Sequence, residues 1–111
     1  MKLAILKQLP IESNVHNPKI TKKILIRKGQ IPHLTNLTQA IFPPGELASA
    51  HSHDDMFEIF FVEKGRGTIK INGKPYPLEE GTCVTVELGD THELINSSSE
   101  DLVIMYMGIK V

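Results

Sequence analysis

The sequence lacks several features that would assign it to a specialised class of protein. Among its 111 residues it has a single cysteine, Cys83, which excludes an intrachain disulfide and a zinc cluster built from thiolates. Cys83 lies in the apolar run Cys83-Val84-Thr85-Val86, where a cysteine is typically a small buried strand residue. We therefore expect it to be structural and not a catalytic thiol.

An excess of charge of either sign is also missing. The chain has 12 lysines and arginines against 13 aspartates and glutamates, for a net charge of -1, so nothing favours nucleic acid or an anionic membrane as a partner. Only four apolar residues lie between Lys2 and Lys7, too few for a signal-peptide core or a membrane span. These features predict a cytoplasmic protein with no nucleic-acid and no membrane partner.

Convincing helical periods are absent too, and the chain consists instead of short apolar strands separated by turn signals. The strongest of these signals is Asn72-Gly73, which is typical of a two-residue β-hairpin turn. The expected strands include Lys22–Lys28, Leu34–Phe42, Glu58–Glu63, Thr68–Ile71, Lys74–Leu78 and Leu102–Val111. The pattern predicts an all-β fold, an antiparallel barrel or sandwich.

The chain is long enough for one domain, and 41% hydrophobic with 23% charged residues is an ordinary globular composition. Residues 1–21 contain short apolar pieces broken by prolines. We expect them to form an irregular N-terminal arm, with an edge strand at Leu3–Leu6, that packs on the barrel or on a partner chain. Residues 22–111 are expected to form the single barrel domain.

Lysines lie at both ends of the expected strand KKILIRK, residues 22–28. Such cations can bind an acidic ligand, but lysines also protect an edge strand from unwanted pairing, and we favour protection. On the later strand, alternation turns Glu58, Phe60 and Val62 toward the interior and leaves Ile59 and Phe61 outside. These two apolar residues need cover from a second layer or from another subunit.

Two histidines occur one residue apart in the stretch GELASAHSHDDMFEIFFVEKG, residues 45–65. On one strand His51 and His53 point to the same side. Asp54-Asp55 has turn chemistry, and a turn there would bring Glu58 opposite the histidines across a hairpin. An isolated pair of this kind is more often exposed or hydrogen-bonded than a metal site. His16, in a polar loop, is likewise expected to be an exposed residue.

A second stretch, GTCVTVELGDTHELIN, residues 81–96, adds His92 after a Gly89-Asp90 turn signal. Together the two stretches resemble the paired motifs of the cupin superfamily. The first motif is matched at every fixed position by Gly45, His51, His53, Glu58 and Gly65. The second is matched by Gly81, Gly89, His92 and Asn96, whereas Glu87 stands where the family usually has proline.

The resemblance implies a small single-domain cupin, that is, a double-stranded β-helix or jelly-roll barrel, with His51, His53, Glu58 and His92 as metal ligands. Nitrogen and oxygen donors of this kind suit Mn, Fe, Co, Ni, Cu or Zn and disfavour Mg and Ca. An octahedral ion would keep two positions for water, dioxygen or a substrate. The expected cofactor is one divalent transition metal of unassigned identity.

Several functions are compatible with such a site, because one fold hosts many chemistries. The first is a metal-dependent enzyme acting on a small molecule in the barrel, as a dioxygenase or a Lewis-acid isomerase or lyase. The second is a non-catalytic module that binds a small ligand through its metal, and the third is a barrel that carries no metal. No catalytic general base stands out. The expected substrate pocket contains Phe60, Asn96, Met105 and Tyr106, and a homodimer is the expected assembly.

Overall fold

The protein is made almost entirely of antiparallel strands, as the sequence predicts. Its structure, a computed structural model, describes all of residues 1–111. The elements are a short 3-10 helix, η1 (Leu6–Gln8), and the strands β1 (Glu12–Ser13), β2 (Thr21–Ile26), β3 (Leu34–Phe42), β4 (Leu47–His51), β5 (Met56–Lys64), β6 (Gly67–Ile71), β7 (Lys74–Leu78), β8 (Cys83–Val86), β9 (His92–Ile95) and β10 (Leu102–Lys110). This three-residue helix is far too short to cross a bilayer.

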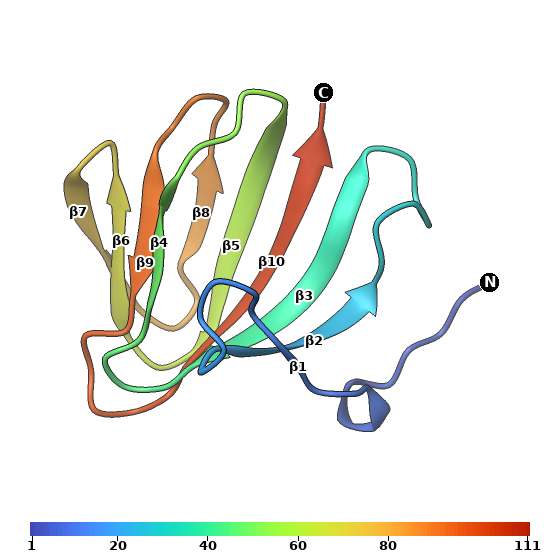
Figure 1. The fold of residues 1–111 in the computed structure, drawn as a ribbon, viewed down its shortest axis with the longest axis horizontal. Coiled ribbons are helices and arrows are strands. Elements are labelled where there is room, and N and C mark those ends of the chain that lie inside the picture. The colour runs from blue at the N-terminus through green and yellow to red at the C-terminus, as the bar shows by residue number, and fades with distance from the viewer.

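The strands form two sheets around a common interior (Figure 1). The larger sheet has the order β1-β2-β3-β10-β5-β8 and the smaller one the order β4-β9-β6-β7. Consecutive strands therefore often lie in different sheets, and the chain crosses between them, as in a jelly roll. The predicted jelly-roll fold is confirmed, and so is the hairpin at Asn72-Gly73, which joins β6 to β7.

The core follows from strand alternation. On β5 the inward side chains Glu58, Phe60 and Val62 are buried, whereas Phe61 is 42% exposed, as predicted. The hydrophobic cluster between the sheets comprises Ile20, Ala40, Phe42, Phe60, Val62, Ile69, Leu78, Val86, Leu94, Leu102 and Ile104. Burial of this apolar area is the main stabilising term of the fold.

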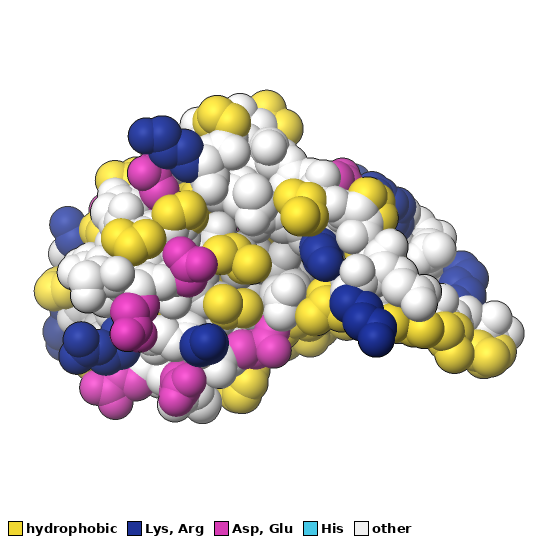
Figure 2. All heavy atoms as spheres, turned by 90° about the horizontal axis from the view of Figure 1, so that it is seen from below, with side chains coloured by type: hydrophobic (Ala, Val, Ile, Leu, Met, Phe, Trp, Pro, Cys, Tyr) yellow, Lys and Arg dark blue, Asp and Glu magenta, His cyan; other side chains and the backbone are white.

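The N-terminal arm differs from the expectation. Residues 1–5 form no strand and are followed by η1, because the outer edge of β2 is already occupied by β1 through the pairs Glu12–Lys22 and Ser13–Thr21. The arm runs beyond β2 (Figure 1) and leaves Met1, Leu3 and Ile5 exposed. Figure 2 shows hydrophobic side chains along this projecting end of the molecule.

Cys83 is exposed, which corrects the expectation of a buried cysteine. It lies opposite Phe61 on the outer face of the larger sheet. Its neighbours in sequence Val84 and Val86 turn inward instead and pack in or against the core. The alternation of β8 was visible in the sequence, but which side faces the core depends on its register with β5.

We expect Gly65→Ala to destabilise the protein more than Gly73→Ala. Both glycines have a positive φ, +87° and +82°, so both substitutions carry a backbone strain of about 1–2 kcal/mol. A methyl group at Gly65 would also collide with the backbone oxygen of Asp101, whereas none of the neighbouring atoms lies within 4 Å at Gly73. Urea denaturation should show an additional loss of at least about 1 kcal/mol for Gly65→Ala. Equal losses would show that the backbone relaxes around the added methyl.

Candidate metal centre

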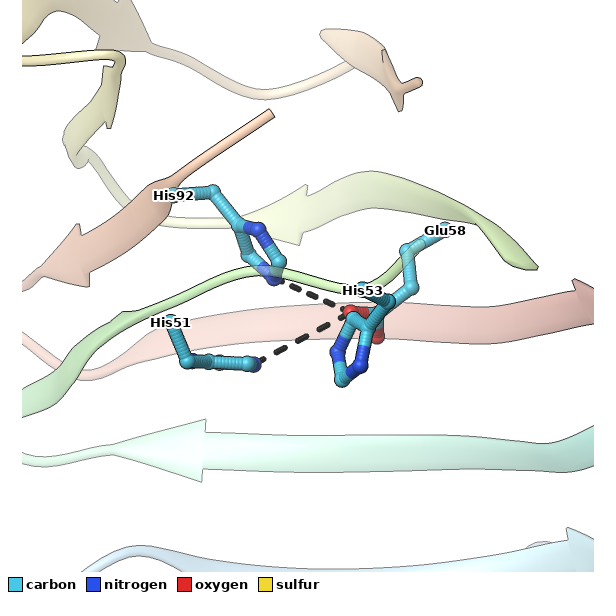
Figure 3. Close-up of side chains that lie close together, drawn as sticks. All are labelled: His51, His53, Glu58 and His92. Atoms are coloured by element: carbon cyan, nitrogen blue, oxygen red, sulfur yellow. Dashed lines mark hydrogen bonds and ion pairs between the residues drawn. The ribbon is translucent and has the colours of Figure 1, made fainter. Parts of the chain in front are cut away.

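Four side chains from both sheets converge at one end of the barrel interior. His51 is the last residue of β4, His53 follows two residues later, Glu58 lies on β5, and His92 begins β9. One nitrogen or oxygen atom from each lies within 4.8 Å of the others. Figure 3 shows the side chains pointing toward one another. The structure therefore brings together all four predicted ligand residues as a group that could hold a metal ion.

The path of the chain between these residues differs from the predicted hairpin. Strand β4 pairs with β9, through His51 opposite His92, and not with β5. Glu58 belongs to the other sheet, where β5 pairs with β10 and β8. It therefore faces the histidines across the interior. His53 lies just outside β4, so the two histidines converge at the end of a strand and not along its length.

The distances centre on one carboxylate oxygen. Glu58 Oε1 is 2.9 Å from His53 Nε2 and 2.9 Å from His92 Nε2, and 4.0 Å from His51 Nε2. His92 is fully buried and Glu58 is 8% exposed, whereas the side chain of His51 is 48% exposed. One side of the cluster is thus enclosed and the other faces the mouth of the barrel.

Backbone contacts orient two of the rings. His51 Nδ1 donates to the carbonyl oxygen of Ser49 at 2.8 Å, and His92 Nδ1 donates to that of Asp90 at 3.1 Å. A carbonyl oxygen can only accept, so Nδ1 carries the hydrogen and Nε2 is the nitrogen available as a ligand. Three imidazoles and one carboxylate, held in this way, fit a divalent transition metal.

The pKa values of Glu58 and His92 are shifted in opposite directions, as expected for two groups that share a proton. Burial alone would raise the pKa of Glu58, but the hydrogen bond from His92 and the charges of His92, His53 and His51 outweigh it and lower that pKa. Burial alone would lower the pKa of His92, but its hydrogen bonds with Glu58 and Asp90 raise it. Metal-free protein therefore favours an ionised Glu58 beside a protonated His92.

A cavity of about 170 Å³ borders the cluster. Eight of its 13 lining residues are hydrophobic, including Phe60 and Tyr106, which stack with their ring centres 5.6 Å apart. Burial raises the pKa of the Tyr106 hydroxyl, a hydrogen bond with Thr38 opposes this, and the charge of Glu58 adds to it. The polar lining residues are Asn14, His16, Lys22, His51 and Glu58.

The other two predicted pocket residues, Asn96 and Met105, lie outside this cavity. Asn96 is fully buried, and its amide donates to the carbonyl oxygens of Phe42 and Glu100 at 2.8 and 2.7 Å, so it fastens the end of β9. Met105 lies opposite Phe61 on the outer face of the larger sheet. On β10, Met105 alternates with the residues that point inward. The sequence alone could not determine which set of alternating residues faces the interior.

Three polar residues of the cavity, namely Asn14, His16 and Lys22, were not predicted from the sequence. Lys22 alternates with the buried Ile20 and Ile24. This alternation would have predicted that Lys22 lies on the inner face of β2, and it argues against a role in edge protection. His16 is exposed, as expected, but it stands at the cavity. The loop 14–17 contacts parts of the barrel that are distant in sequence. No local sequence pattern predicts these contacts.

Comparisons with known proteins agree with this architecture. The profile of the family described as Cupin domain matches residues 38–108. A Thermotoga maritima protein named oxalate-binding protein is 33% identical over 60 residues, which are 54% of this chain and 50% of that protein. The chain thus spans about half the length of this curated relative.

Solved structures with the same fold cover nearly the whole chain. A predicted oxalate decarboxylase from Thermotoga maritima superposes with a TM-score of 0.92 and 23% identity, over 99% of this chain and 100% of that one. KdgF from Halomonas sp. superposes with a TM-score of 0.83 and 20% identity, over 100% of this chain and 96% of that one. A sugar phosphate isomerase of the cupin superfamily from Silicibacter pomeroyi superposes with a TM-score of 0.84 and 14% identity, over 99% of this chain and 76% of that one.

We expect the contribution of Glu58 to the stability of metal-free protein to depend on pH in both directions. Its lowered pKa gives stability above the unfolded-state pKa that is lost as pH falls through the folded-state pKa. The raised pKa of His92 gives stability below its unfolded-state pKa that is lost as pH rises through its folded-state pKa. Urea denaturation in chelator, from about pH 2 to about pH 9, should show the largest difference in stability between wild type and Glu58→Gln near the middle of this range and smaller differences at both ends. A difference that does not vary with pH would contradict the shared proton.

Proposed function

The chain belongs to the cupin family, and we propose that it holds one divalent transition-metal ion and uses it to bind and act on a small molecule. The ligands would be His51, His53, Glu58 and His92. The observation that carries this proposal is the convergence of their donor atoms within 4.8 Å beside a cavity. Structural metal sites are closed by protein ligands, whereas this one borders space for a ligand.

The donor set supports Mn, Fe, Co, Ni, Cu or Zn without selecting one of them. When bound, such an ion supplies Lewis acidity and positions for an oxygen ligand. The protein residues determine what reaches it. His51 and His53 stand on the more exposed side of the cluster, while Phe60 and Tyr106 form part of the apolar wall of the cavity.

The size of the cavity supports a small ligand. About 170 Å³ is close to the roughly 150 Å³ of an engineered cavity that binds benzene, and well below the roughly 300–1,000 Å³ of pockets for drug-sized molecules. The protonated hydroxyl of Tyr106, whose pKa is raised, can donate a hydrogen bond to an oxygen atom of the bound molecule. Small carboxylates are therefore good first candidates.

Two outcomes at this site are chemically distinct. As an enzyme, the protein would act as a dioxygenase or as a Lewis-acid isomerase or lyase on an oxygen-containing substrate. As a binding module, it would hold the ligand without turnover, and the relative named oxalate-binding protein supports this second candidate. Both require the metal.

We also propose that two chains associate through the outer face of the larger sheet. Register places apolar residues of neighbouring strands side by side there, among them Met105 beside Phe61 and Met107 beside Ile59. Phe61 is 42% exposed in the single chain. The apolar arm at the adjacent edge of this sheet would extend the contact, so a second copy is the partner that fits this face.

We expect His51→Ala to abolish tight metal binding while leaving the barrel folded, because the exposed His51 is not part of the core. Elemental analysis of untagged protein should give about one ion per chain for wild type and very little for the variant. The control, His33→Asn, removes a histidine outside the cluster at a position with φ +70°, which asparagine tolerates. Glu58→Gln should weaken binding less, since an amide oxygen can still coordinate. Full metal content in His51→Ala would refute the four-ligand assignment.

The same preparations decide between enzyme and binding module. Oxygen uptake and product analysis with oxalate, enediols, phenols and diketones should show metal-dependent turnover if the protein is an enzyme. Thermal stabilisation by one of these compounds without turnover would identify a binding module. Wild-type protein that neither contains metal nor takes it up would refute both.

For the assembly, we expect wild type to sediment as a dimer and Phe61→Lys as a monomer at micromolar concentration. A buried lysine at the contact would lack a partner. Tyr76→Lys is the matched control, because Tyr76 is also 42% exposed but lies on the smaller sheet. A dimer that survives Phe61→Lys, or one that only Tyr76→Lys disrupts, would exclude this face.

A further inference from the structure

Lys22 is a cation on the interior face of the barrel. It lies on β2 between Ile20 and Ile24, which are 1% and 8% exposed, and is opposite the buried Ala40 on β3. It lines the same cavity as Glu58. The position is unusual, because lysine is among the residues least often found on a core-facing side without a partner.

Two carboxylates near Lys22 are paired with other residues. Glu12, opposite in register on β1, is bound by Arg27, with Nη2 2.5 Å from Oε2. Glu58 is held by the histidines at 2.9 Å. No ion pair within 4.0 Å involves Lys22. Lys22 is thus a cation without an ion-pair partner, on a residue that lines a mostly apolar cavity.

An ordered loop lines the cavity next to Lys22. Asn14 Oδ1 accepts from the backbone nitrogens of His16 and Asn17 at 2.9 and 3.2 Å. The Asn17 amide in turn donates to Glu46 Oε1 and to the carbonyl oxygen of Leu47, each at 3.1 Å. The N-terminal segment is therefore fastened to the smaller sheet, and its residues Asn14 and His16 complete the polar rim of the cavity around Lys22.

We propose that Lys22 recognises an ionised acid group of the ligand, and that the ligand is a small acid with two oxygen-donor groups. One group would meet the metal centre, and the other, a carboxylate, would pair with Lys22. This inference rests on the proposed function and specifies its ligand class. It assigns β2, an element outside both sequence motifs, to ligand selection.

Charge and volume both support this class. A divalent ion with three neutral imidazoles and one carboxylate has a net charge of about +1, and Lys22 raises the charge of the cavity to about +2, which complements a dianion. A cavity of about 170 Å³ admits a molecule somewhat larger than benzene, on the scale of the roughly 150 Å³ cavity that binds it. Short dicarboxylates with a hydroxyl or keto group meet both conditions, whereas nucleotides are too large.

The alternative is that Lys22 only covers apolar surface with its aliphatic part and extends its ammonium group to water. A lysine of that kind would be replaceable by methionine without any change in ligand preference. The two roles therefore differ in ligand preference and need not differ in stability.

The test compares two ligands that share a 2-hydroxy acid group and differ in a distal carboxylate, 2-hydroxysuccinate and 2-hydroxypropanoate. Metal-loaded protein would be titrated with each by calorimetry at fixed pH and ionic strength. Wild type should prefer 2-hydroxysuccinate by about tenfold or more, the usual scale for a hydrogen bond to a charged group. Lys22→Met should lose that preference while its affinity for 2-hydroxypropanoate stays within about twofold of wild type, and Lys22→Arg should keep it.

Lys23→Met is the matched control. It removes the same charge from the adjacent position of β2, where the side chain instead donates to the carbonyl oxygen of Leu6, and it should keep the wild-type preference. Thermal unfolding and metal content of each variant would be measured first. An unchanged preference in Lys22→Met, an equal loss in Lys23→Met, or no binding of either ligand by metal-loaded protein would overturn the role of Lys22. Absence of metal before any ligand is added would instead refute the proposed function itself.

Discussion

A buried carboxylate is the constraint on which the rest of this structure depends. Glu58 points from the larger sheet into the interior, where an ionised group is costly unless it is paired and hydrogen-bonded. Its partners come from the opposite sheet and from the loop that crosses between the sheets. The requirement to satisfy one oxygen therefore fixes how the two sheets face each other at this end of the barrel. The hydrophobic cluster holds the remainder of the interface without needing directional contacts.

A network of backbone and side-chain hydrogen bonds holds the buried histidine in place. Asn72, in the hairpin turn of the smaller sheet, donates to Asp90 Oδ1 at 3.0 Å and accepts from the nitrogen of Thr91 at 2.9 Å. Asp90 Oδ2 accepts from the nitrogen of Glu87 at 3.1 Å. Glu87 occupies the position where cupins usually have proline, and proline has no N–H to make this bond. Here a hydrogen bond shapes the turn before His92 in place of a fixed φ angle.

The sequence predicted those features that depend on local spacing. Alternation was enough to place Glu58 and Phe61 on opposite faces of β5, and the motif spacing identified all four residues that converge. The sequence was insufficient for features that depend on which strands become neighbours in a sheet. The hairpin expected between His53 and Glu58 does not form, because β4 pairs with β9 far along the chain. Met105 was placed on the wrong face for the same reason, since the orientation of β10 follows from its register with β3 and β5.

The protonated cluster explains how a site of this kind can be built before a metal arrives. In metal-free protein, a proton between His92 and Glu58 satisfies both buried groups, so the ligand atoms are held close together without an ion. A metal would then replace that proton, and little reorganisation of the barrel would be needed. Metal binding that replaces a proton would release protons and would weaken as pH falls. The same arrangement confines the adjustable part of the site to its open side, where the exposed His51, the N-terminal loop and Lys22 meet the cavity. If Lys22 selects the ligand as proposed, selection would change through these residues without disturbing the buried pair that joins the two sheets.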